Sequence, residues 1–216
     1  SDQAPAMLIN DRVFTSLTPN KVKRILRKLR QHEDLQNIDT LAGEGNNNHP
    51  LVRSMVKNNI RLSGDVLLGS DSQGKGLTKA LSLSPEDVMQ HLEEAHLQGR
   101  GGAGYLTTVK WRIAANTPAE KRFIICNADE GDPGAFMDRS ILEGDPHSVL
   151  EGMLIAGYAI GSNQGFMYVR NEYPLAVKRL VTAIKQAEAY GLLGDNIAGT
   201  DFCFNVKIST GAGAFV

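Results

Sequence analysis

The chain has 216 residues, enough for one substantial domain or for one domain and a fragment of another. Its 42% hydrophobic and 22% charged residues are typical of globular proteins, and its formal net charge of −1 gives no electrostatic argument for a nucleic-acid partner. No apolar run approaches the roughly 18 residues of a membrane-spanning helix. No signal peptide opens the chain, and two cysteines cannot supply a four-thiolate metal site, so we expect a cytoplasmic protein that binds no metal itself.

Residues 1–34 are predicted to form two short strands and a helix. Apolar residues 6–9 and 13–14 flank an Asn-Asp turn. Thr18 followed by Pro19 is a typical helix start, and an apolar stripe follows at helical spacing, made by Val22, Ile25, Leu26 and Leu29. A hairpin and one helix cannot bury a complete core. We therefore expect this region to be the end of a domain that begins upstream.

A polar stretch at 35–52, rich in glycine and asparagine, is predicted to be a linker. Ser84-Pro85 then opens a helix that we expect to end at Gly99. A glycine loop, residues 99–104, follows directly, and a helix is predicted from about Thr107 to Ala115. The loop therefore joins two helices in this interpretation.

Strands and helices alternate in the rest of the chain. Strands are predicted at 122–126, 165–169 and 204–208. One helix between them carries an apolar face from Val149 to Ala156, and another runs from Pro174 to Tyr190. This alternation predicts an α/β fold with a mainly parallel sheet and flanking helices.

The glycine loop matches G-x-G-x-x-G through Gly99, Gly101 and Gly104. Such glycines let the backbone approach a phosphate closely, and the next helix offers its first amides to the same group. A dinucleotide-binding fingerprint must follow a strand, however, and this loop follows a helix. Taken alone, the motif fits a tight helix–helix turn equally well.

Polar side chains gather where two predicted strands end. Asn127, Asp129 and Glu130 follow the first strand, and Tyr168 and Glu172 lie at the end of the second. Ligands of open α/β sheets bind at this edge, so these residues favour a site over a simple turn.

Two further side chains are candidates near the glycine loop. Tyr105 could stack on a flat ring or merely anchor the loop. Lys110 could neutralise a phosphate, although a lone lysine is more often a surface residue.

Five ordered motifs resemble the FMN- and NADH-binding flavoprotein subunit family of respiratory complex I. Residues 99–111 resemble its GRGGAGFPTGLKW signature, 126–134 its CNADE-x-EPG, and 168–173 its YxRGEY. Residues 191–194 and 211–215 also match. Within the family, the sequence is most similar to the diaphorase subunit of NAD-reducing hydrogenases.

The resemblance implies a domain organisation and cofactors. Residues 1–34 resemble the end of a thioredoxin-like [2Fe–2S] domain, 35–52 would be a linker, and 53–216 an FMN- and NADH-binding domain cut short at its C-terminal end. The implied cofactors are FMN and NAD(H), with [2Fe–2S] and [4Fe–4S] clusters whose ligands this chain lacks. The implied partners are iron–sulfur subunits of a hydrogenase, a formate dehydrogenase or complex I, on the cytoplasmic side of any membrane complex.

The resemblance also implies residue roles. The residues expected to contact FMN are Gly99, Gly101, Gly102, Lys110, Asn127, Asp129, Tyr168 and Glu172. Those expected to face NADH are Tyr105, Glu130 and Asp132. Glu130 and Glu172 are the candidate catalytic residues. The implied reaction is hydride transfer between NAD(H) and FMN, followed by release of single electrons to iron–sulfur clusters.

Some positions depart from the family pattern. Leu106 replaces a proline and Thr108 a glycine, while Asp132 replaces a glutamate and Asn171 a glycine. These changes bear more on NADH affinity than on FMN binding. Two alternatives stay open: a truncated chain that folds without binding a cofactor, and a Rossmann dinucleotide-binding enzyme without flavin.

Overall fold

A computed structural model describes residues 5–9, 12–15, 17–33, 35, 38, 64, 67–69, 74–132 and 135–211. The chain divides by its contacts into two compact units, Ser1–Lys57 with Asp132–Gly134, and Asn58–Gly131 with Ala135–Val216. Most of the predicted linker, and residues 212–215 of the last motif, lie outside the described residues.

The first unit contains the hairpin and the helix expected from the sequence. Strands β1 (Met7–Ile9) and β2 (Arg12–Phe14) pair antiparallel, and helix α1 spans Pro19–Arg30. The Thr18 side chain caps α1 by accepting a hydrogen bond from the Lys21 amide at 3.2 Å. Its small core consists of Phe14, Ile25 and Ile38.

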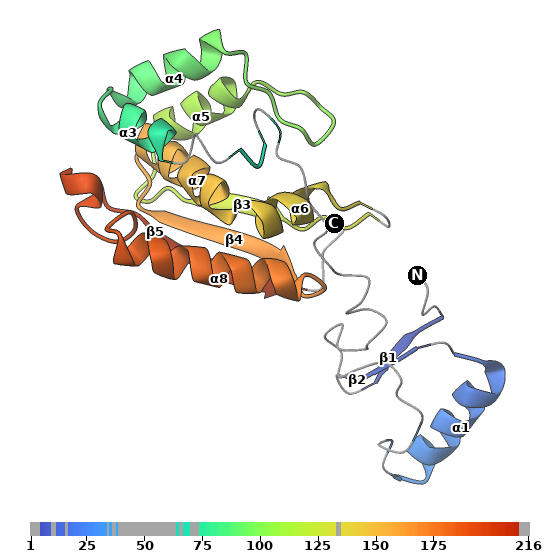
Figure 1. Ribbon diagram of the computed structural model, residues 1–216. Helices are drawn as coiled ribbons and strands as arrows, with labels where there is room; N and C mark the ends of the chain where they lie inside the picture. The colour runs from blue at the N-terminus through green and yellow to red at the C-terminus, as the bar shows by residue number, and fades with distance from the viewer. Residues whose placement is uncertain are drawn as a thin grey trace. The chain divides into compact units, whose positions relative to one another are not determined.

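The second unit is built on a parallel sheet of three strands, in the order β3 (Ile124–Ala128), β4 (Gln164–Arg170) and β5 (Asn205–Gly211). Helix α7 (Pro146–Ile160) connects β3 to β4, and α8 (Pro174–Ala189) connects β4 to β5 (Figure 1). The α/β prediction with a mainly parallel sheet is thus confirmed.

One hydrophobic core joins this sheet to its helices. Met167 and Val169 of β4 are fully buried and belong to the same cluster as Leu150 and Leu154 of α7 and residues of α8, namely Ala176, Leu180 and Ala183. Helix α7 packs so closely against Phe204 that only a small residue fits at the contact. A Cβ atom at Gly157 would come within 2.5 Å of the Phe204 ring. Burial of this apolar face holds the strand ends in place.

In the described part of the second unit, three helices precede the sheet: α3 (Lys75–Leu81), α4 (Pro85–Glu94) and α5 (Thr107–Asn116). The predicted start of α4 at Ser84-Pro85 is confirmed, and it forms a capping box in which Ser84 and Asp87 exchange hydrogen bonds. The predicted end of this helix at Gly99 is wrong. The helix ends at Glu94, His96 adopts a positive φ of 48°, and Gln98 pairs with Leu106 instead.

Two further differences concern the neighbourhood of β3. The strand runs two residues beyond the predicted end, because Asn127 and Ala128 pair with Tyr168 and Val169 of β4. Helix α3 and the short helix α6 (Met137–Gly144), which follows β3, were not predicted from the sequence. A single 3₁₀ turn, Ile197–Gly199, precedes β5.

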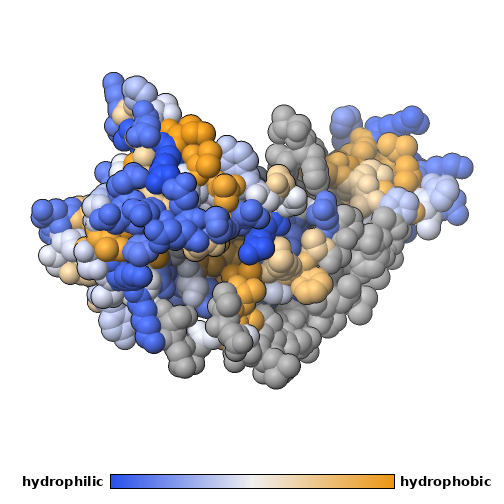
Figure 2. Space-filling view, turned by 90° about the horizontal axis from the view of Figure 1, so that it is seen from above, coloured by the Kyte–Doolittle hydropathy of each residue, from blue (hydrophilic) through white to orange (hydrophobic). Residues whose placement is uncertain are grey.

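Helices long and apolar enough to cross a bilayer are not found among the described residues. In the view of Figure 2, apolar side chains form several separate groups between hydrophilic ones. Exposed apolar residues of the α/β unit include Tyr105, Val109 and Ile113, which recur at four-residue spacing from the glycine loop into α5.

Candidate functional site

The glycine loop forms a short hairpin between α4 and α5. The Gly99 amide donates to the Tyr105 carbonyl at 2.8 Å, and the Thr107 amide to the Leu97 carbonyl at 2.9 Å. Gly102 adopts a φ of 103°, a conformation that residues with a Cβ rarely take. The glycines are exposed, and a Cβ at Gly101 would meet no atom within 4 Å. The backbone of the loop tip is therefore open to a ligand.

The first turn of α5 has donors without acceptors. Its N-cap residue, Leu106, has no side chain that could cap the helix. Among the described residues, the amides of Thr108 and Val109 have no recorded acceptor, as expected for the first turn of an uncapped helix. The Thr108 hydroxyl is buried, with 2% of the residue exposed, and also lacks a recorded partner in the described part of the chain. Such a turn suits an anion.

The second group of candidates lies at the carboxyl end of the sheet. Asn127 and Tyr168 are direct partners in the β3–β4 register, so their side chains lie on the same face of the sheet. The Asn127 side-chain oxygen accepts a hydrogen bond from the Asp129 amide at 3.1 Å. The Tyr168 ring covers Gly211, where a Cβ would overlap the tyrosine hydroxyl. These contacts fix a polar surface at the strand ends.

The Glu130 carboxylate is hydrogen-bonded to the first turn of α6. Its carboxylate accepts hydrogen bonds from the amides of Asp138 at 3.0 Å and Arg139 at 3.1 Å, and so caps this helix. The Tyr173 hydroxyl donates to the same carboxylate at 3.2 Å and lies 3.1 Å from the Glu130 carbonyl oxygen. Burial, followed by the charge of Glu130, raises the pKa of Tyr173 to about 12.

Arg170, which the sequence analysis did not select, lies among the candidate acids. Its guanidinium donates to both carboxylate oxygens of Glu172, at 2.6 and 3.3 Å, and to the Glu130 carbonyl at 2.9 Å. The Asp129 carboxylate lies 3.9 Å from the same group. The arginine stands inside the resembled YxRGEY motif, which was the one signal that could have identified it.

Asp138, at the start of α6, and Cys126, in β3, are partly buried and have raised pKa values. Burial, followed by the charge of Glu130, raises the pKa of Asp138. Burial, followed by the charge of Asp138, raises the pKa of the Cys126 thiol to about 11. Cys126 therefore stays protonated and unreactive at neutral pH, as expected for a structural cysteine.

The structure brings the candidates together in two groups. Asn127, Asp129, Glu130, Tyr168 and Glu172 gather at the strand ends, whereas the second group lies on the loop and α5, namely Gly99, Gly101, Gly102, Tyr105 and Lys110. In Figure 1 the loop and the ends of β3 and β4 lie at the same end of the α/β unit.

Asp132 is exposed and belongs by its contacts to the first unit, apart from these two groups of the second unit.

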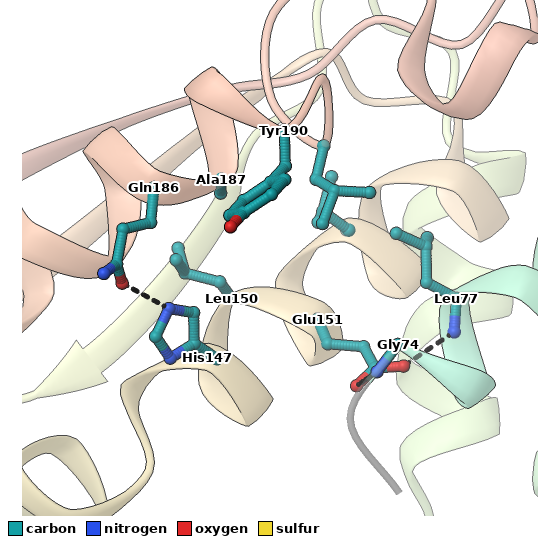
Figure 3. A pocket seen from close by; sticks show the side chains of 10 residues that line it. Gly74, Leu77, His147, Leu150, Glu151, Gln186, Ala187 and Tyr190 are labelled. Carbon is teal, nitrogen blue, oxygen red and sulfur yellow. Dashed lines mark hydrogen bonds between the residues drawn. The ribbon is translucent and has the colours of Figure 1, made fainter.

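A cavity of about 340 Å³ lies elsewhere, between α3, α7 and α8 (Figure 3). Its wall is mostly apolar, with Tyr190 on one side and the His147–Gln186 hydrogen bond of 2.9 Å on another. Glu151 turns toward α3, where its carboxylate accepts from the Leu77 amide at 2.8 Å. None of the candidate residues lines this cavity, so it is not part of the proposed cofactor site.

Comparisons with known proteins point to one family. Residues 92–216, well over half of the chain, match the family model described as the Nuo51 FMN-binding domain. The HndC subunit of the NADP-reducing hydrogenase of Solidesulfovibrio fructosivorans is 54% identical over 66% of this chain and 29% of its own length. The alpha subunit of the NAD-reducing hydrogenase HoxS of Cupriavidus necator is 40% identical over 100% of this chain and 36% of its own length.

A solved structure agrees with these matches. The crystal structure of an NAD⁺-reducing [NiFe]-hydrogenase in the air-oxidized state aligns with a TM-score of 0.61 and 31% identity, covering 99% of this chain and 34% of that one. The chain thus spans about a third of the length of the relatives it matches. The predicted resemblance is confirmed: this chain belongs to the family of Nuo51 FMN-binding domains.

Proposed function

We propose that this chain is the FMN-carrying, NAD(H)-binding core of a flavin oxidoreductase, with diaphorase activity. One observation carries the proposal: in a member of an FMN-binding family, an open glycine loop and an uncapped helix start lie at the same end as the polar ends of parallel strands. Hydride transfer from NAD(H), followed by single-electron transfer to iron–sulfur clusters, is the chemistry that FMN supplies when bound.

The residues present fit a phosphorylated flavin. The amides of Thr108 and Val109, which have no acceptor among the described residues, suit its phosphate, and the exposed Lys110 side chain on the same helix adds a positive charge. The positive φ of Gly102 and the open space at Gly101 allow a close backbone approach. We infer that Gly99, Gly101, Gly102 and Lys110 hold FMN from this side.

The strand ends supply the other side of the proposed site. Asn127, Asp129, Tyr168 and Glu172 would orient the flavin ring by hydrogen bonds, and Tyr105, whose side chain is 54% exposed, is available to stack on NADH. Glu130 and Asp132 are the acids proposed to face NADH. Glu130 would have to act from its position at the start of α6, because both carboxylate oxygens already accept backbone hydrogen bonds there.

Glu172, the other acid proposed as catalytic, has 41% of its side chain exposed, and both of its carboxylate oxygens accept hydrogen bonds from Arg170. The proposed electron acceptors are iron–sulfur subunits of a larger cytoplasmic enzyme, since the two relatives named above are hydrogenase subunits. A hydrogenase is favoured by those names over a formate dehydrogenase or complex I. The [2Fe–2S] and [4Fe–4S] clusters would belong to parts of that enzyme outside this chain.

A flavin titration tests this function. We expect the purified protein to bind one equivalent of FMN, to acquire the visible absorbance of a bound flavin, and to lose it when NADH is added anaerobically. Gly101→Ala should weaken FMN binding about tenfold, equivalent to about 1.4 kcal/mol, without lowering the melting temperature, since its Cβ meets no protein atom. Gly152→Ala, on the exposed surface of α7, is the matched control.

Two results would contradict the proposal. A protein that stays colourless in excess FMN would favour the alternative of a chain that folds without cofactor. Binding of NADH with no flavin would favour a dinucleotide-binding enzyme, which the position of the loop after a helix argues against.

A further inference from the structure

We propose that Arg170 is a positioning residue of the candidate site, whose guanidinium holds Asp129, Glu172 and the backbone at Glu130 in one arrangement before a cofactor binds. This inference rests on the proposed function, because it assigns a role to the acids at the strand ends. It concerns a residue that would act through its neighbours and not by touching the flavin.

All three guanidinium nitrogens are directed at acceptors of the protein. Nη1 lies 2.9 Å from the Glu130 carbonyl oxygen, Nη2 lies 2.6 Å from one Glu172 oxygen, and Nε lies 3.3 Å from the other. The Arg170 side chain is 18% exposed. Three of the five guanidinium N–H donors are thus used within the protein, two of them on one carboxylate.

The position of Arg170 in the strand explains why it reaches all three partners. It is the last residue of β4 and lies two residues beyond Tyr168, so it shares the face on which Asn127 and Tyr168 lie. The chain turns immediately after it, where the Tyr173 amide donates to the Arg170 carbonyl at 3.1 Å. This turn brings the Glu172 carboxylate back to the Arg170 guanidinium, two residues earlier in the chain.

Charge gives the second argument. The carboxylates of Asp129 and Glu172 both approach this one cation, at 3.9 and 2.6 Å. Two carboxylates at a common edge repel each other, and they would also repel an anionic cofactor. Arg170 offsets this repulsion, and its hydrogen bond to Glu172 raises its own pKa, so it stays charged at any physiological pH.

Lysine could not replace this arrangement. An ammonium group is a single point of charge, whereas the planar fork of arginine binds one carboxylate with two nitrogens and keeps the third for a carbonyl. We therefore expect Arg170→Lys to keep the charge and lose the geometry. The variant separates the two contributions.

The test is a double-mutant cycle read by FMN affinity, with Arg170→Gln, Glu172→Gln and the double variant. FMN binding should weaken at least tenfold in Arg170→Gln, and the double variant should bind no more weakly than Arg170→Gln alone, because the arginine acts through the glutamate. The FMN affinity of Arg170→Lys should lie between those of the wild type and Arg170→Gln. In Arg170→Gln, the factor by which KM for NADH rises should exceed the factor by which kcat falls. Arg112→Gln, which also loses two carboxylate partners, Glu86 and Glu93 on α4, is the control and should bind FMN normally.

Specific results would overturn the inference. If Arg170→Gln lowered only the melting temperature and bound FMN like the wild type, the arginine would be purely structural. If the losses of FMN binding free energy in Arg170→Gln and Glu172→Gln added fully in the double variant, Arg170 would contact the cofactor directly. If Arg170→Gln does not fold, the lysine variant decides: unaltered FMN affinity there also refutes the role of geometry. Failure of the wild type itself to bind FMN would instead refute the proposed function, and the inference with it.

Discussion

At the scale of single residues, Tyr173 connects the turn after β4 to the turn after β3. Its hydroxyl group donates toward the carbonyl and the carboxylate of Glu130, while the Arg139 guanidinium lies 5.7 Å from the centre of its ring. The tyrosine is buried, so its hydroxyl must stay protonated and hydrogen-bonded. This one side chain ties α6 to the carboxyl end of the sheet.

The raised pKa of Tyr173 gives a pH dependence with a defined sign. Between its ordinary value near 10 and its folded value of about 12, the unfolded chain releases the tyrosine proton first, so rising pH favours unfolding. We expect the free energy of unfolding to fall across this window in the wild type, and this contribution to be missing in Tyr173→Phe. Denaturant titrations at pH 8 and pH 11.5 measure the difference.

The same substitution should lower stability at pH 8 by about 0.5–1.5 kcal/mol, the usual net value of a lost hydrogen bond. Tyr190→Phe is the control. Because Tyr190 is 81% exposed, this substitution should change neither the free energy of unfolding at pH 8 nor its dependence on pH. An identical pH profile in Tyr173→Phe and in the wild type would show that the hydroxyl is not held as described.

At the scale of elements, the sequence identified those whose signals are local. The Ser84-Pro85 start of α4, the proline start of α8 and the three apolar strands are each marked by residues within the element itself. The parallel order also follows from the alternation of strands and helices. The family motifs marked both groups of candidate site residues.

The two helices that were missed take their caps from far along the chain. The first amides of α6 donate to Glu130, eight and nine residues upstream. The Leu77 amide of α3 donates to Glu151, 74 residues downstream. Neither helix has a capping side chain at its own N-cap, so the local sequence contains no capping pattern that predicts its start. Arg170 was missed for a similar reason, because its partners Asp129 and Glu130 lie 41 and 40 residues upstream.

Two glycines of α7 should respond oppositely to alanine. A Cβ at Gly157 would come within 2.5 Å of the Phe204 ring and 3.2 Å of the Ser162 carbonyl oxygen, so Gly157→Ala should destabilise the fold by about 1–3 kcal/mol. Gly152 has open space around it, and Gly152→Ala should stabilise by about 0.5–1 kcal/mol through helix propensity. Thermal unfolding of both variants measures the contrast, and equal shifts would refute the packing of α7 against Phe204.

At the scale of the whole molecule, the chain contains separate cores. Phe14, Ile25 and Ile38 form the core of the first unit, while the larger cluster of the second unit includes Leu180 and Met167. The candidate site residues other than Asp132 belong to the second unit. We propose that the first unit is the end of a thioredoxin-like domain, and that the second is an FMN- and NADH-binding domain.

This division predicts where the effect of a core cavity should spread. Ile25→Ala and Leu180→Ala each remove a fully buried side chain, which typically costs about 2–5 kcal/mol. Hydrogen exchange followed by mass spectrometry should show faster exchange in α1 and the β1–β2 hairpin for Ile25→Ala, with FMN affinity unchanged. Leu180→Ala should instead loosen α7, α8 and β4 and weaken FMN binding, because β4 carries Tyr168 and Arg170. Faster exchange of β4 in Ile25→Ala would mean that the two cores unfold as one cooperative unit.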